Sequence, residues 1–85
     1  MANKHVEEAV IAALRKLGCD VDQVLPVQEL EGDLGVDSTE MVELAALVRT
    51  DCGLTIENLN LRGVRTVADL TTRVEALVEQ QRSIR

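Results

Sequence analysis

Hydrophobic residues recur at helical spacing in three separate stretches of the chain. Within each stretch the apolar positions repeat every three or four residues, which is typical of a helix with one buried face. We therefore predict helices over residues 3–17, 38–52 and 66–80. The expected buried stripes are Val6, Ala9, Val10, Ala13, Leu14 and Leu17 in the first, Met41, Leu44, Ala45 and Val48 in the second, and Val67, Leu70, Val74, Leu77 and Val78 in the third.

The two stretches between these helices lack the helical period. Residues 18–37 contain Pro26, Gly32 and Gly35, which are unfavourable inside a helix. A loop of that length in a small domain needs hydrophobic anchors in the core. Residues 54–65 form the second connection, and we expect a short helical turn at residues 55–59. The anchors expected in the first connection are Val21, Val24, Leu25, Val27, Leu30 and Leu34.

Length and composition favour one small helical domain. The chain has 85 residues without a change in composition, so we expect a single domain over 1–85 in which 81–85 form a frayed tail. Aromatic residues are absent although 46% of the chain is hydrophobic, and an aliphatic core suits a helical bundle. The predicted fold class is all-α: three main helices, a short helix before the last, and a long first loop. No hydrophobic seam requires an oligomer, and we expect a monomer.

The negative charge is confined to the middle of the chain. The net charge is −6, yet residues 20–57 alone hold ten acids and one base. A negative surface without aromatic residues argues against a nucleic-acid partner. An acidic face of this kind favours partners with basic surfaces.

No metal site or membrane segment is predicted. Cys19 and Cys52 are not spaced as a metal-binding pair, and His5 is the only histidine. An acid pattern beginning at Asp20 resembles a calcium loop, but Val24 and Leu25 occupy positions that need an oxygen ligand and a glycine. The amino-terminal stretch becomes amphipathic at once, so we expect a cytoplasmic protein with two free, structural thiols and no membrane partner.

The candidate site is the turn Gly35-Val36-Asp37-Ser38 that leads into the second predicted helix. Asp37 can cap that helix, and Glu40 three residues later completes a capping-box pattern. Ser38 would then lie at the helix start with an exposed hydroxyl. A phosphate attached there would face free N–H groups and the positive end of the helix dipole. A plain helix cap is the alternative interpretation of Ser38 at this point.

The longer string resembles the phosphopantetheine attachment motif of acyl carrier proteins. The resemblance is carried by residues 34–38, Leu-Gly-Val-Asp-Ser, and by Glu40, Val42, Glu43 and Leu44, and the helix order extends it over most of the chain. It implies that a phosphopantetheinyl transferase attaches phosphopantetheine from coenzyme A to Ser38, beside Asp37. The arm would carry an acyl group as a thioester between acyl-loading and acyl-processing enzymes.

The same resemblance implies a partner surface on the second helix, where carriers meet basic docking patches. Glu40, Glu43 and Asp37 match acidic positions of the family, and Thr39 and Val42 belong to the same surface. Two features depart from the pattern of fatty-acid carriers. Thr39 replaces the usual Leu, and Arg49 and Thr50 stand at positions that are usually acidic. We therefore expect a free-standing carrier for a specialised, polyketide-like pathway.

Three other functions remain as alternatives. A standalone peptidyl or aminoacyl carrier shares the fold, although Val36-Asp37 before the serine favours the acyl type. A helical adaptor without a prosthetic group would use the acidic face alone. A hydrolase using Ser38 lacks a nearby base and the glycine that follows a nucleophile elbow, so we predict that the chain is not an enzyme.

Overall fold

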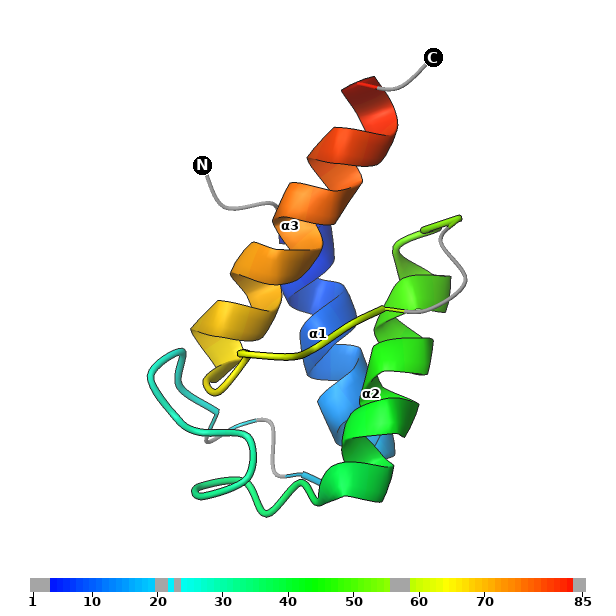
Figure 1. Cartoon of the computed structure of the whole chain (residues 1–85). Helices are drawn as coiled ribbons and strands as arrows, with labels where there is room; N and C mark the ends of the chain where they lie inside the picture. Colours follow the sequence, from blue (N-terminus) through cyan, green and yellow to red (C-terminus); the bar gives the residue numbers. More distant parts are fainter. Residues whose placement is uncertain (1–3, 20–21, 23, 56–58, 84–85) are drawn as a thin grey trace.

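The structure, a computed structural model, describes residues 4–19, 22, 24–55 and 59–83 and contains three helices (Figure 1). They are α1 (Lys4–Lys16), α2 (Ser38–Asp51) and α3 (Val67–Ser83). In the described ranges, strand pairing is limited to one isolated bridge between Glu29 and Thr66. The all-α fold class is confirmed, and the helix starts agree with the sequence prediction to within one residue.

The helix α1 packs against both other helices, whereas α2 and α3, both fully described, do not approach each other directly. The segment 59–66 runs between them instead (Figure 1). The three predicted apolar stripes supply most of the core, in which Leu14, Leu30, Leu44 and Leu70 are the largest fully buried side chains. The stripe residues Leu17, Met41, Leu77 and Val78 are half-buried at its edge.

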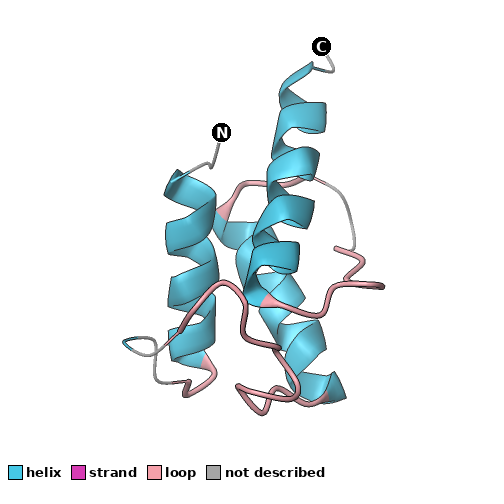
Figure 2. Ribbon diagram, turned by 90° about the vertical axis from the view of Figure 1, so that its left-hand side faces the viewer, coloured by secondary structure: helices cyan, strands magenta, loops and turns pink. Residues whose placement is uncertain are grey.

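The first connection is organised by Leu30, which is buried in the core. Its N–H donates to the carbonyl of Arg65 at 2.8 Å, and its own carbonyl accepts the N–H of Val36 at 2.8 Å. The N–H of Val67 also donates to the carbonyl of Gln28. This connection lies at the end of the bundle opposite both termini (Figure 2). The starts of α2 and α3 are therefore tied to the same short stretch of chain.

Two of the expected loop anchors do not reach the core. Leu25 and Val27 are 57% and 77% exposed, so this part of the sequence prediction was wrong. They flank Pro26 in a turn that the N–H of Gln28 closes onto the carbonyl of Leu25 at 3.0 Å. The turn directs both side chains outward, and buried Val36 supplies an anchor that the pattern did not indicate.

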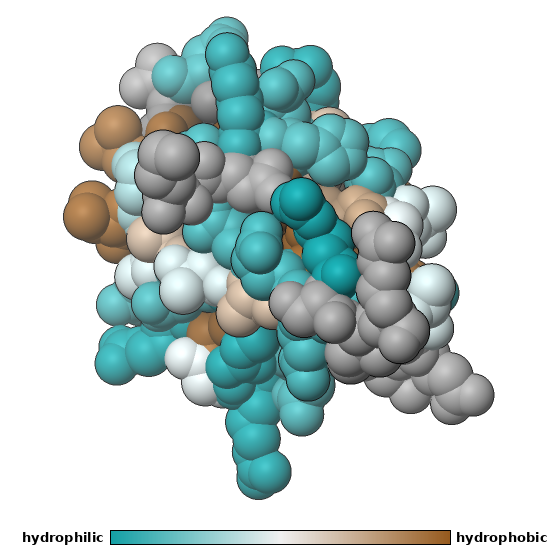
Figure 3. Space-filling view, turned by 90° about the horizontal axis from the view of Figure 1, so that it is seen from above, coloured by the Kyte–Doolittle hydropathy of each residue, from teal (hydrophilic) through white to brown (hydrophobic). Residues whose placement is uncertain are grey.

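The helix α3 continues through Ser83, three residues further than predicted. The Gln81 side chain explains the extension, since its amide nitrogen donates to the carbonyl of Gly53 at 2.9 Å. Its amide oxygen accepts the N–H of Thr55 at 2.8 Å. Most of the turn expected at 55–59, and residues 84–85 of the expected tail, lie outside the described residues. Seen from this end of α3, the molecule shows mostly hydrophilic side chains (Figure 3).

Candidate functional site

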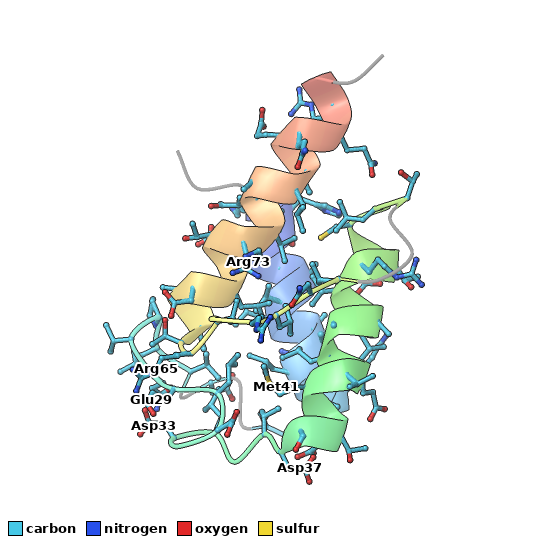
Figure 4. The ribbon with its side chains drawn as sticks, viewed as in Figure 1. Glu29, Asp33, Asp37, Met41, Arg65 and Arg73 are labelled. Atoms are coloured by element: carbon cyan, nitrogen blue, oxygen red, sulfur yellow. The ribbon has the colours of Figure 1, made fainter. Side chains whose placement is uncertain are left out.

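The helix α2 begins with a complete capping box. Asp37 is the N-cap, with extended backbone angles, and its carboxylate accepts the N–H of Glu40 at 2.8 Å. In return, the N–H of Asp37 donates to the Glu40 carboxylate at 3.1 Å. Gly35, two residues before Asp37, has a φ of +70°, a left-handed conformation that favours glycine. The predicted turn and cap therefore place Ser38 as the first residue of α2 (Figure 4 labels Asp37).

The Ser38 hydroxyl is exposed and makes no hydrogen bond with any residue that the structure describes. The interpretation of Ser38 as a plain cap is therefore wrong, because Asp37 performs that role. At the start of a helix the first N–H groups have no intrahelical partner. The N–H groups of Ser38 and Thr39 find no carbonyl in the described part of the chain. The hydroxyl thus lies at a helix end that favours a phosphate group.

Replacing Asp37 by Ala is expected to lower the free energy of unfolding by about 0.5–2 kcal/mol, because the Glu40 N–H loses its acceptor. Asn accepts the same hydrogen bond, so Asp37→Asn is the matched control and should lose much less. Urea unfolding followed by circular dichroism measures both variants. Equal losses in the two variants would show that the carboxylate charge, rather than the cap, stabilises this end of α2.

A surface groove of about 630 Å³ begins at Ser38 and follows α2. Its first wall is α2 itself, whose Met41, Val42 and Ala45 provide apolar surface. Its second wall is the irregular segment 59–64, which occupies the space between α2 and α3. The remaining lining residues are Glu31, Ala46, Arg49, Leu59, Asn60, Leu61, Arg62, Gly63 and Val64.

Arg73 of α3 holds the second wall in place. Its guanidinium donates to the carbonyl of Asn60 at 2.6 Å and to the carbonyl of Arg62 at 2.8 Å. Figure 4 shows Arg73 reaching from α3 toward this segment. Within the wall, the Asn60 side chain accepts the N–H of Arg62 at 2.8 Å. The sequence did not identify these residues, because an arginine on a polar helix face carries no signal of the loop that it binds.

The outer face of α2 brings three predicted partner-binding residues together next to Ser38. Thr39, Val42 and Glu43 are all exposed, and residues three and four apart are neighbours on a helix surface. Val42 is 73% exposed, which is high for a large apolar side chain. Glu40 differs from the others, since it is partly buried and one of its oxygens closes the capping box.

The only histidine lies far from Ser38. The His5 ring Nε2 lies 3.2 Å from the carbonyl oxygen of Asp51, at the opposite end of α2. Burial raises the pKa of the Cys19 and Cys52 thiols, and the charges of Glu40 and Asp51 respectively add to that effect. Among the described residues no group of His, Cys, Asp and Glu could hold a metal ion, and no helix is long and apolar enough to cross a membrane.

Comparisons with known proteins agree on one family. The family described as "Phosphopantetheine attachment site" matches residues 9–74. A meromycolate extension acyl carrier protein from Mycolicibacterium smegmatis is 32% identical over 79 residues, which are 87% of this chain and 80% of the relative. Its counterpart from Mycobacterium leprae is 30% identical over 87% of this chain and 69% of the relative. An acyl carrier protein from Saccharopolyspora erythraea is 32% identical over 79% of this chain and 72% of the relative. No solved structure matches the chain.

Proposed function

Because the chain belongs to the phosphopantetheine-binding carrier family, we propose that Ser38 is its attachment residue and that the attached arm carries acyl intermediates as thioesters. The prosthetic group of the family is covalent phosphopantetheine, and its carriers interact with a phosphopantetheinyl transferase and with acyl-processing enzymes. The observation that carries the proposal is the Ser38 hydroxyl, exposed at the start of α2 and without a hydrogen-bond partner in the described structure.

The attachment reaction uses Ser38 as the acceptor. The Ser38 oxygen forms a bond to the phosphorus of the phosphopantetheine moiety, and the pyrophosphate bond of coenzyme A breaks. Adenosine 3′,5′-bisphosphate leaves with the bonding electrons, and the hydroxyl proton passes to a base of the transferase. The N–H groups of Ser38 and Thr39 and the positive end of the α2 dipole would stabilise the phosphodiester once it is attached.

The chain's own residues present the arm and contribute no acid–base chemistry. When bound, the arm supplies a terminal thiol that carries the acyl group as a reactive thioester. Thr39, Val42 and Glu43 form the partner surface beside it, where Glu43 faces basic docking patches and Val42 provides an apolar contact. Glu40 contributes its charge from the same turn of α2. Since Thr39 replaces the Leu that is usual in the family, the apolar contact next to Ser38 is smaller in this carrier.

The carrier serves a specialised acyl pathway rather than routine fatty-acid synthesis. The relatives named for meromycolate extension, and the acyl carrier protein of Saccharopolyspora erythraea, support an acyl cargo over an aminoacyl cargo. Arg49 on α2 changes the charge at a position that is usually acidic in fatty-acid carriers. A changed charge pattern on the docking helix selects some partners and rejects others.

Intact-protein mass spectrometry tests the proposal directly. The purified chain is incubated with coenzyme A, Mg²⁺ and a phosphopantetheinyl transferase of broad specificity, and the product is fragmented to locate the modification. The expected result is one phosphopantetheine per chain on Ser38. An unmodified but folded chain would refute the attachment and favour a helical adaptor. Loading of the modified chain by an amino-acid-adenylating enzyme, without loading by acyl transferases, would replace the acyl cargo with an aminoacyl one.

A further inference from the structure

The groove beside Ser38 is unusually rich in positively charged donors for this part of the molecule. Arg49 lines it from α2, and Arg62 lines it from the opposite wall. Among the described lining residues the only carboxylate is Glu31. The surrounding stretch, residues 20–57, has ten acids and one base, and that base is Arg49. Arg49 already interacts within the protein, so Arg62 is the arginine that the groove offers to an occupant. The outer face of α2, by contrast, presents the carboxylate of Glu43.

The Arg62 guanidinium is available to a ligand. Its backbone N–H donates to the Asn60 side chain, and its carbonyl accepts from Arg73. The guanidinium itself forms no hydrogen bond or ion pair with any residue in the described part of the chain. This arrangement fixes the backbone of Arg62 by two side chains, Asn60 and Arg73, while leaving the five guanidinium N–H donors unused.

Ser38 and Arg62 line the same groove, so a chain that is attached to Ser38 and lies in the groove passes beside Arg62. Ser38 and Arg49 lie eleven residues apart on α2, which corresponds to about 16 Å at the helical rise of about 1.5 Å per residue. The surface between them is apolar, formed by Met41, Val42 and Ala45. A chain lying along the groove thus has the apolar residues of α2 on one wall and Arg62 on the other.

We propose that this groove holds acyl chains that carry oxygen close to the thioester, as a β-carbonyl or a carboxylate, and that Arg62 is the residue that selects them. This proposal rests on the attachment of the arm to Ser38. Guanidinium groups form strong, geometrically defined hydrogen bonds with carboxylates and also donate to carbonyl oxygens. A saturated chain of the same length contacts the apolar wall of α2 but offers Arg62 only the thioester carbonyl and no second acceptor, so it is held less firmly.

Nuclear magnetic resonance of the loaded chain tests this selection. The transferase loads the wild-type chain from coenzyme A, butyryl-coenzyme A, acetoacetyl-coenzyme A or malonyl-coenzyme A, and intact mass confirms each product. Butyryl and acetoacetyl groups have four carbons each and differ in the β-oxygen. We expect acetoacetyl and malonyl groups to shift the Arg62 Nε–Hε resonance and the amide resonances of residues 61–64 relative to the unacylated arm. The butyryl group is expected to leave the Arg62 resonance in place.

Two variants distinguish the effect of the Arg62 guanidinium from the effect of the net charge of the chain. Arg62→Gln is expected to abolish the difference between acetoacetyl and butyryl at residues 61–64. Arg82→Gln makes the same change in net charge on an exposed residue near the end of α3 and should preserve that difference. Amide spectra of the unacylated forms establish that both variants are folded.

Each contrary result has a distinct meaning. Absence of attachment on the wild-type chain would overturn the proposed function and this inference together. Attachment followed by identical Arg62 resonances for butyryl and acetoacetyl chains would overturn the inference and leave the carrier function intact. A shift of Arg62 on attachment of the arm alone, with no further change on acylation, would show that Arg62 binds the arm's phosphate or amides, and would also overturn the inference.

Discussion

A chain carrying Ser38→Ala is expected to remain folded and to take up no phosphopantetheine. The hydroxyl removed is the one that would accept the group, so the loss should be complete rather than partial. Stability should hardly change, because Ser38 is exposed, its hydroxyl has no partner among the described residues, and the cap belongs to Asp37. The helix propensity of Ala is better than that of Ser by roughly 0.5 kcal/mol, which offsets any small loss.

Intact mass and urea unfolding of the same preparation measure both parts of this expectation. Thr72→Ala is the control, since it removes an exposed hydroxyl on α3, outside the partner surface, and should leave the attachment in place. Attachment to the Ser38→Ala chain would place the acceptor elsewhere. The Asp37→Ala variant should lose stability, and the Ser38→Ala variant should lose attachment. Together they distinguish the capping residue of α2 from the proposed attachment residue.

The largest effect on stability is expected from Leu44→Ala. Leu44 is fully buried on α2 within the core cluster. Truncation of a buried Leu costs about 2–5 kcal/mol, from lost hydrophobic burial and from the cavity that remains. Small domains have total unfolding free energies of about 5–15 kcal/mol, and at roughly 0.05–0.15 kcal/mol per residue this chain belongs at the low end. The variant should therefore lose a large fraction of its stability.

Leu25→Ala is a suitable control because it deletes the same atoms from a side chain that is 57% exposed. Its midpoint in urea should stay close to that of the wild-type chain, whereas the Leu44→Ala midpoint should fall steeply. Similar midpoints for the two variants would contradict the described core.

The helical spacing of the apolar residues predicted the three helices. The stripes that begin at Val6 and Val67 are buried as expected, because each helix must hide one face whatever its neighbours are. The capping box of Asp37 and Glu40 was equally visible, since its partners are three residues apart. The candidate serine could be placed for the same reason: its position depends on local chain geometry.

The parts that were missed depend on contacts between distant residues. The outward direction of Leu25 and Val27 follows from a turn, and composition alone cannot distinguish an outward apolar residue from an anchor. The extension of α3 depends on Gln81 meeting Gly53, which lies 28 residues earlier. The groove has the same origin, because Arg73 fixes its wall through the carbonyls of Asn60 and Arg62, which lie 13 and 11 residues earlier.

The backbones of the described helices α2 and α3 do not approach each other closely, and the groove wall lies between them. One unit, the three helices with their core, sets stability, and another, the outer face of α2, is the proposed partner surface. The segment 59–64 is a third unit, fastened to α3 through the two hydrogen bonds of Arg73. Grafting residues 60–64 of a related carrier, with the buried Leu59 retained, would therefore exchange the groove wall while leaving the core leucines and Ser38 in place. Cargo preference could in this way be re-engineered, or diverge in evolution, independently of the pathway enzymes with which the carrier docks.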